Sequence, residues 1–412
     1  MLKTNKYNRL KKFVKRFFLV FAGVIVVLNL AIIFSGKTYL YKGIKETYLK
    51  GKSGPGIYDS LVFHTRTIAR PKVDNEWTIR STNNLMSDKH KKVFSQLKTT
   101  SFLIVQKGEI VFEKYWENHS PSMRSNSFSV SKSILGLLMG IALDKQLISS
   151  FDDPITKYLS FLPAKDSSVT IRHLLAMASG LQWRESGSNP LSENAAAYYG
   201  SDLKKLVHTL NFDQAPNEVF EYKSGNSQLL ALILQKASGQ NVSAFMEKEL
   251  WGKIGASKNA LWSLDRKNGM EKAFCCLYAT TRDYARIGQL ILNQGIWKGD
   301  TIIHPKTLKE LTKPAFLQKK TKESEHYGLH FWIYNDPQYN VIYARGILGQ
   351  YIITIPELDL VIVRTGHERK DVFQIPVEYE KDKRYIEKNK HKLNHPSDLF
   401  DYIAIAKEII HL

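Results

Sequence analysis

The feature that most constrains this chain is an apolar run from Ile134 to Leu143, which directly follows the segment Ser129–Lys132. Nearly every residue of the run is apolar or small, as is typical of a helix that protein surrounds on all sides. Ser129 and Lys132 are three residues apart, so their side chains share one face of the first turn of that helix. The pattern predicts a buried central helix that carries a hydroxyl beside an amine.

This arrangement indicates a nucleophile and its base. Burial, the free N–H groups of the first turn and the helix dipole all disfavour an ammonium, so the lysine pKa is expected to be lowered. A neutral amine can then take the proton of the serine hydroxyl. Spacing alone is a weak signal, since Ser95 and Lys98 repeat it on what looks like a solvated helix face. The apolar helix behind Ser129 is what favours catalysis.

The N-terminal segment predicts a membrane anchor. A run without charges extends from residue 17 to residue 34, about long enough to cross the hydrocarbon layer of a bilayer. The run is preceded by seven basic residues: Lys3, Lys6, Arg9, Lys11, Lys12, Lys15 and Arg16. Basic residues on this side predict a cytoplasmic N-terminus and an external remainder. A cleaved signal peptide is the alternative, but the end of the run lacks a small-x-small cleavage site, which favours a retained anchor.

Charge and cysteine content exclude some functions. The net charge is +20, and basic residues after the anchor would attract anionic lipid headgroups: Lys37, Lys42, Lys45, Lys50 and Lys52. No nucleic-acid motif accompanies the charge, so a nucleic-acid partner is not expected.

Cys275 and Cys276 are adjacent, which excludes a long-range disulfide framework. His-Glu-x-x-His and Cys-x-x-Cys patterns are absent, and His173 beside Leu174 is interpreted as structural, so no metal or cofactor is expected.

Strand patterns occur near both ends of the remaining chain. Residues 101–105 and 110–112 flank Lys107 and Gly108 as in a hairpin, and a second β-rich block covers 341–344, 351–355 and 360–363. The chain between them is largely helical and includes helices at about 228–237 and 283–292. We therefore expect an α+β fold in which distant segments form one antiparallel sheet, with a helical insertion at roughly 150–290. A last helix, from about 396 to 410, is expected to close over that sheet.

Four segments, in this order, resemble landmarks of the serine β-lactamase-like family: Ser129–Ser133, Asp152–Leu159, Val169–Leu181 and Tyr278–Gly288. The chain is most similar to the class C-like, penicillin-binding-protein-like branch that contains 6-aminohexanoate-dimer hydrolases and related esterases. The similarity covers roughly residues 97 to 366. It implies an antiparallel sheet flanked by helices, an all-helical insertion lobe and serine hydrolase activity.

The resemblance also implies a catalytic tyrosine after the helical block. Tyr222 occupies that place, where its phenol would shuttle protons between the nucleophile, the leaving group and water. Many relatives have Tyr-x-Asn here, whereas this chain has Ser224 at the third position, as in the aminohexanoate-dimer hydrolase branch. Asn226 is a weaker candidate for the missing asparagine.

After the Ser129–Lys132 pair and Tyr222, the third candidate part of the active site is the segment 345–350. Gly346 allows close approach of the backbone, so the N–H groups of Ile347 and Ser129 are expected to form an oxyanion hole. By resemblance, this segment stands where β-lactamases and penicillin-binding proteins have Lys-Thr-Gly, and that motif is absent. Recognition of a penicillin or D-alanine carboxylate is therefore in question, and Arg345 or Lys223 are the candidate replacements for the missing cation.

Together these features predict a membrane-anchored serine hydrolase that cleaves an amide or ester of a small-molecule or peptide-like substrate through an acyl-enzyme. The expected organisation is a cytoplasmic stub at 1–16, an anchor at 17–34, a stalk and a loosely structured lead-in at 35–96, and the hydrolase domain at 97–412. The alternatives are a non-catalytic envelope binding protein of the same fold, and a D-alanyl peptidase or β-lactamase. The oligomeric state stays open.

Overall fold

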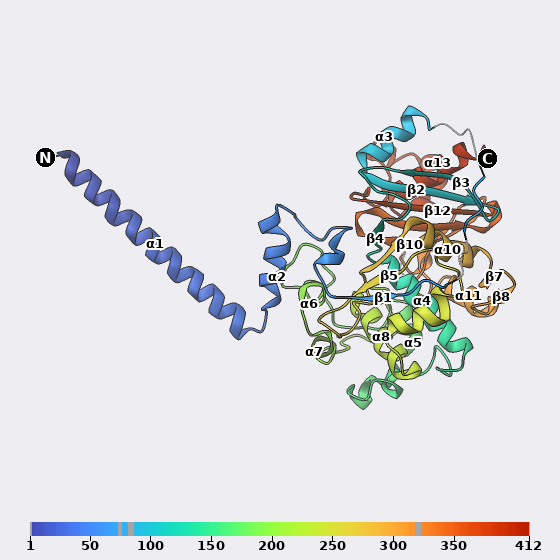
Figure 1. Ribbon diagram of the computed structural model, residues 1–412, viewed down its shortest axis with the longest axis horizontal. Helices are drawn as coiled ribbons and strands as arrows, with labels where there is room; N and C mark the ends of the chain where they lie inside the picture. The colour runs from blue at the N-terminus through green and yellow to red at the C-terminus, as the bar shows by residue number, and fades with distance from the viewer. Residues whose placement is uncertain (1, 73–75, 81–85, 318–322, 412) are drawn as a thin grey trace.

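The computed structural model describes residues 2–72, 76–80, 86–317 and 323–411, with backbone alone for 2–9 and 323–324. Helix α1 (Leu2–Phe34) projects from the body of the molecule (Figure 1). Its segment Leu10–Phe34 is 25 residues long and apolar enough to cross a membrane, and none of the tested window is buried against protein. The expected apolar helix is therefore present, with the length and composition of a membrane span.

The main sheet has six strands in the order β3-β2-β12-β11-β10-β9, and every neighbouring pair is antiparallel. Its strands are β2 (Thr99–Gln106), β3 (Glu109–Tyr115), β9 (Trp332–Asn335), β10 (Asn340–Gly346), β11 (Gln350–Ile355) and β12 (Leu360–Gly366). The register pairs Ile104 of β2 with Ile362 of β12. The hairpin and an antiparallel sheet assembled from both ends of the chain are confirmed.

Helices cover both faces of this sheet (Figure 1). On one face lie α4 (Val130–Asp144) and α10 (Thr281–Leu292); on the other lie α3 (Asp88–Gln96) and α13 (Ser397–Ile409). A Cβ on Gly288 of α10 would meet Val361 of β12 at 2.4 Å, so the glycine allows the helix to lie close to the sheet. Leu399, Ile403 and Ala406 of α13 are buried, which confirms the predicted closing helix.

A second, four-stranded antiparallel sheet was not predicted. Its order is β1-β5-β6-β4, with β1 (Thr65–Ile68), β4 (Arg124–Asn126), β5 (Ala260–Ser263) and β6 (Leu277–Thr280). These strands are only three or four residues long, too short for a clear alternating pattern. Two of them, β5 and β6, lie within the region 150–290 that was expected to be helical.

The lead-in segment is also more ordered than expected. It contains α2 (Tyr39–Glu46) and β1, and the buried Ile57 accepts a backbone hydrogen bond from Asn126 of β4. The expectation of a loose lead-in is wrong where α2 and β1 form, whereas the domain boundaries themselves stay a prediction. The pairing of β1 with β5 is a contact between distant parts of the chain, which no local pattern reveals.

The described residues form further helices, some of which pack against α4. They are α5 (Ile171–Leu175), α6 (Glu193–Tyr199), α7 (Leu203–Val207), α8 (Ser224–Ser238), α9 (Val242–Met246), α11 (Pro305–Leu311) and α12 (Lys383–Asn389), and a short hairpin joins β7 (Ile296–Trp297) to β8 (Asp300–Thr301). Helix α4 packs against α8 as well as the sheet, and its residues 130–142 are all buried. The prediction of a central helix enclosed by protein is confirmed.

Candidate active site

Ser129 and Lys132 meet at the N-terminal end of α4. The Lys132 Nζ lies 2.9 Å from the Ser129 Oγ and donates a 2.8 Å hydrogen bond to the Phe274 carbonyl. Only 1% of Lys132 is exposed. The Phe274 carbonyl orients the Lys132 amine because it accepts one of the amine's N–H groups. The position of Nζ beside the Ser129 hydroxyl suits proton transfer between these two groups.

The backbone next to these groups is strained. Phe128, directly before Ser129, has φ +44°; Cys276, two residues after Phe274, has φ +71°; and Leu348, directly after Ile347, has φ +63°. A left-handed conformation is unfavourable for side chains of this size and costs roughly 1–3 kcal/mol at each position. Three such residues in three separate segments around one hydroxyl are typical of a functional site.

The segment after β10 lies against the start of α4. A Cβ placed on Gly346 would stand 2.4 Å from the Ser127 carbonyl oxygen and 3.2 Å from the Ser129 backbone nitrogen, so only glycine allows this approach. Ile347 follows directly, is 44% exposed and lines the same pocket as Ser129. The Ser129 N–H belongs to the first turn of α4 and has no acceptor inside the helix. The structure thus brings together the two segments expected to hold an oxyanion.

Tyr222 lies on the other side of the lysine. Its ring centroid is 5.1 Å from the Lys132 Nζ, and the ring stacks on Trp332 with centroids 5.7 Å apart. Tyr327 meets the same ring edge-on at 6.1 Å. The sequence placed Tyr222 near the nucleophile, but it gave no sign of the two aromatic rings that hold it.

The candidate cations have other partners. The Lys223 amine donates to the Leu181 carbonyl and to Glu221, both at 2.6 Å, so it is held between its own loop and the segment at Leu181. The Arg345 guanidinium stacks on the Trp332 ring at 3.6 Å. Neither residue lines the pocket at Ser129, so the structure gives no support to either as a replacement for the cation of Lys-Thr-Gly.

Ser224 binds Glu185, a residue that the sequence did not mark as a candidate. Its backbone N–H and its hydroxyl both donate to Glu185, at 2.7 and 2.8 Å, and the Trp183 indole N–H donates to the same carboxylate. Glu185 and Ser224 line the pocket together with Ser129. Nothing in the sequence marked Glu185, because its role depends on a contact between residues 39 positions apart.

Two further candidates prove to be structural. Asn226 is completely buried and accepts a hydrogen bond from Ser179 at 2.6 Å, so it does not replace the asparagine of Tyr-x-Asn. His173 caps α5 through reciprocal hydrogen bonds with Thr170, which agrees with its interpretation from the sequence as a structural residue. Within the described residues, no group of three His, Cys, Asp or Glu side chains could hold a metal ion.

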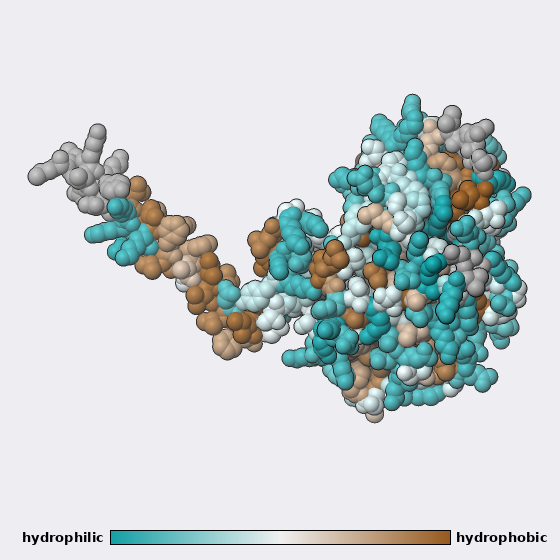
Figure 2. Space-filling view, in the orientation of Figure 1, coloured by the Kyte–Doolittle hydropathy of each residue, from teal (hydrophilic) through white to brown (hydrophobic). Residues whose placement is uncertain are grey.

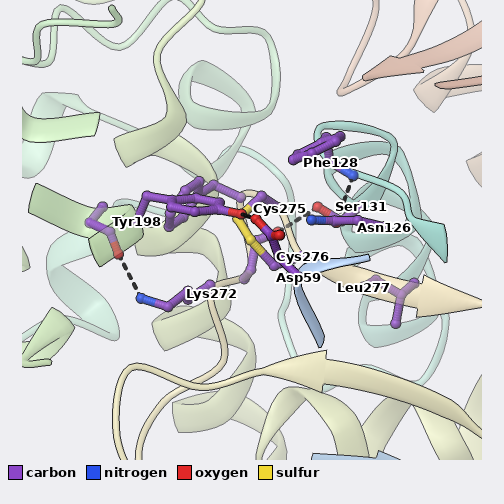
Figure 3. Close-up of a disulfide and its surroundings, with 12 residues drawn as sticks. Asp59, Asn126, Phe128, Ser131, Tyr198, Lys272, Cys275, Cys276 and Leu277 are labelled. Carbon is purple, nitrogen blue, oxygen red and sulfur yellow. Dashed lines mark hydrogen bonds between the residues drawn. A yellow bond between two sulfur atoms is a disulfide. The ribbon is translucent and has the colours of Figure 1, made fainter. Parts of the chain in front are cut away.

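The segment that positions Lys132 also carries a disulfide between the neighbours Cys275 and Cys276. Figure 3 shows this bond between Lys272 and the loop that carries Phe128. Cys275 lines the pocket, and the preceding residue, Phe274, supplies the carbonyl that binds the lysine. The disulfide joins adjacent residues and therefore creates no long-range link, in agreement with the sequence.

A pocket of about 250 Å³ opens at Ser129. One part of its lining consists of Phe128, Ser129, Phe274, Cys275 and Ile347, and another part belongs to the loop 185–190. Among the described lining residues, Glu185 is the one ionisable acid, and neither lysine nor arginine is present. The pocket therefore offers no cationic side chain to a substrate carboxylate.

The fold is that of the β-lactamase-fold hydrolases, and the comparison with protein families gives the same class. Residues 90–372 match the Beta-lactamase family, so the chain belongs to that family. This confirms the resemblance to the serine β-lactamase-like proteins and the expected fold.

Individual relatives show which members of the family this chain is similar to. A 6-aminohexanoate-dimer hydrolase from Paenarthrobacter ureafaciens is 26% identical over 288 residues, which cover 65% of this chain and 72% of that protein. A Bacillus anthracis structure assigned by name to the 6-aminohexanoate-dimer hydrolases has a TM-score of 0.68 at 19% identity, covering 85% of this chain and 92% of that one. A family VIII carboxylesterase has a TM-score of 0.55 at 16% identity, covering 76% and 99%. The two structures show the shared fold.

Proposed function

We propose that this protein is a membrane-anchored serine hydrolase that cleaves an ester or a linear amide through an acyl-enzyme intermediate. The observation that carries the proposal is the 2.9 Å contact between the buried Lys132 amine and the Ser129 hydroxyl, at the edge of a pocket. A protein that only binds ligands has no need of a desolvated lysine beside a serine. The named 6-aminohexanoate-dimer hydrolase and the carboxylesterase support amide or ester chemistry.

In the first half-reaction, the Lys132 amine accepts the hydroxyl proton while the Ser129 Oγ attacks the substrate carbonyl. The N–H groups of Ser129 and Ile347 stabilise the negative charge on the carbonyl oxygen. The leaving group departs with a proton delivered from Lys132 through Tyr222. In the second half-reaction, water attacks the acyl carbonyl and gives a proton through Tyr222 to Lys132. Lys132 returns that proton to the Ser129 Oγ as the bond to the acyl group breaks and the carboxylic acid is released.

The anchoring part of the proposal rests on α1 and its charges. Leu10–Phe34 has the length and composition of a membrane span. The seven basic residues before the apolar run favour a cytoplasmic N-terminus, which puts the hydrolase domain on the external side of the membrane. Protease digestion of intact cells, which degrades the domain only when it is external, tests this orientation.

The catalytic part is tested with a soluble fluorophosphonate, which reacts with activated serines. The full chain in detergent micelles should be labelled, and Ser129→Ala should abolish labelling. Ser188→Ala is the matched control, because Ser188 lines the same pocket and is not in contact with a lysine in the described structure. Labelling of the Ser129→Ala variant at the wild-type rate would contradict the proposal.

Substrate class is tested with short-chain esters, linear amides and a chromogenic cephalosporin. We expect ester or amide cleavage and weak cephalosporin turnover, because the pocket offers no cation to the carboxylate of a β-lactam. Efficient cephalosporin hydrolysis would instead support a β-lactamase or D-alanyl peptidase. Ligand binding without turnover, unchanged in Ser129→Ala, would support a non-catalytic binding protein.

A further inference from the structure

The wall of the pocket at Ser129 includes the helix that directly follows the predicted membrane span. Helix α2 and the residue after it contribute Tyr39, Leu40, Gly43, Ile44 and Thr47 to the lining, and Tyr48 follows. Only residues 35–38 separate the end of α1 from the start of α2. Even a fully extended chain spans at most about 17 Å between Phe34 and Tyr39. The pocket wall therefore begins close to the end of the apolar helix.

Two sets of contacts hold α2 in this place. The Tyr41 hydroxyl donates to Asn29 of α1 at 2.8 Å, which ties α2 to the last turns of the apolar helix. On its other side, the Tyr39 hydroxyl donates to the Pro190 carbonyl at 3.1 Å, and Gly43 lies against the Tyr199 ring. Helix α2 is thus a fixed connection between the predicted span and the pocket (Figure 1).

The pocket is apolar and open where α2 borders it. Ile44 is 41% exposed and Tyr48 is 65% exposed, and both line the pocket. Leu49, next to Tyr48, is 77% exposed. Figure 2 shows groups of hydrophobic atoms on either side of hydrophilic ones at α2, between α1 and the body of the molecule. Exposed apolar side chains beside a membrane span are expected to contact the bilayer interface.

Basic residues complete this surface. The segment between α1 and β1 carries Lys37, Lys42, Lys45, Lys50 and Lys52. Such residues attract anionic headgroups to the membrane surface beside them. The Lys42 amine lies over the Phe63 ring at 4.2 Å, Lys50 pairs with Glu46, and the Lys52 amine lies 3.6 Å from Asp59. Lys45 lies on the exposed side of the segment. The pocket itself has no such cation among its described residues, so the part of a substrate that enters it need not be anionic.

We infer that the substrates are membrane-resident amphiphiles, whose apolar chains stay in or near the bilayer while an ester or amide close to the headgroup reaches Ser129. Ile44 and Tyr48 form the apolar entrance on the membrane side. This inference rests on the proposed function, since it requires both the anchored domain and the reactive serine. It predicts that α2 increases reaction with anchored molecules more than reaction with soluble ones.

The experiment compares two fluorophosphonates with the same reactive group, using the full chain reconstituted in vesicles of phosphatidylcholine and phosphatidylglycerol. One probe is soluble, and the other is attached to the headgroup end of a dialkyl lipid in the vesicle. With either probe, the Ser129 Oγ forms a bond to phosphorus, fluoride departs and the hydroxyl proton passes to Lys132. The readout is the ratio of the anchored to the soluble labelling rate, which corrects for protein facing the vesicle interior.

We expect the double variant Ile44→Ser, Tyr48→Ser to lower this ratio by about 10-fold or more, because it removes apolar contact at the entrance. Val377→Ser is the matched control, since Val377 is 80% exposed and does not line the pocket, and it should keep the wild-type ratio. Circular dichroism and thermal unfolding show whether the double variant is folded, and the ratio removes any change in rate that is common to both probes.

The outcomes separate the two proposals. An unchanged ratio in the double variant, or an equal fall in Val377→Ser, overturns the inference. So does a wild-type protein that reacts with the soluble probe and not with the anchored one, although serine hydrolase activity then stands. Failure of both probes to label Ser129 overturns the proposed function and the inference with it.

Discussion

The close approach of Gly346 to the nucleophile makes Gly346→Ala the sharpest test of the oxyanion hole. Gly346 has φ −124° and ψ 161°, which alanine adopts without strain, so the effect of the substitution is purely steric. The added Cβ would stand 2.4 Å from the Ser127 carbonyl oxygen, whereas ordinary van der Waals contact begins at 3.4 Å. The segment at Ile347 and the loop before Ser129 must therefore separate by about 1 Å, a displacement that typically slows catalysis about 10²-fold.

The expected 10²-fold decrease in rate agrees with the effect of losing one oxyanion-hole donor, which lowers the turnover rate by roughly 10²- to 10³-fold. A 10²-fold fall corresponds to about 2.7 kcal/mol of lost transition-state stabilisation. Overpacking lowers the free energy of unfolding by about 1–3 kcal/mol, so the variant is expected to remain folded. The assay is the labelling rate of the full chain by the soluble fluorophosphonate, together with thermal unfolding followed by circular dichroism.

Gly187→Ala is the matched control. Gly187 lines the same pocket, and a Cβ there meets no atom within 4 Å, so the labelling rate should stay within about twofold of wild type. A folded Gly346→Ala variant that reacts as fast as the wild type would refute the role of this segment in holding the oxyanion.

Three further predictions concern buried ionisable groups. Lys132→Met should lower Ser129 labelling by about 10² to 10⁴, the usual contribution of a general base, and wild-type labelling of the folded variant would contradict that role. Burial lowers the pKa of Lys272 to about 7, so the unfolded chain binds more protons between pH 7 and 10.5 and stability rises with pH there. Urea unfolding should show this rise, at most about 1.4 kcal/mol per pH unit, in the wild type and not in Lys272→Met; equal slopes would contradict it. Burial lowers the pKa of His330 to about 3, so its contribution to stability is complete above about pH 6.5 and is lost as the pH falls towards 3. Thermal unfolding between pH 7 and 4 should therefore lose less stability in His330→Gln than in the wild type, and parallel losses would count against this assignment.

The sequence by itself determined the central helix, the main sheet and the pairing of Ser129 with Lys132. These features depend on local patterns: the apolar run after Lys132, the alternating strands and the turn at Lys107 and Gly108. The i, i+3 spacing brings the amine to the hydroxyl in any α-helix, and the apolar run buries it. Local geometry was sufficient for this part of the site.

Only the tertiary structure decided what surrounds that pair. The Phe274 carbonyl binds Lys132, Glu185 binds Ser224, and α2 lines the pocket, and each of these contacts joins residues far apart in the chain. A backbone carbonyl carries no residue-specific signal, and an acidic residue in a loop looks like any solvated side chain. Such contacts exist only after the sheet and its helices have packed, because packing and not local propensity brings those segments together.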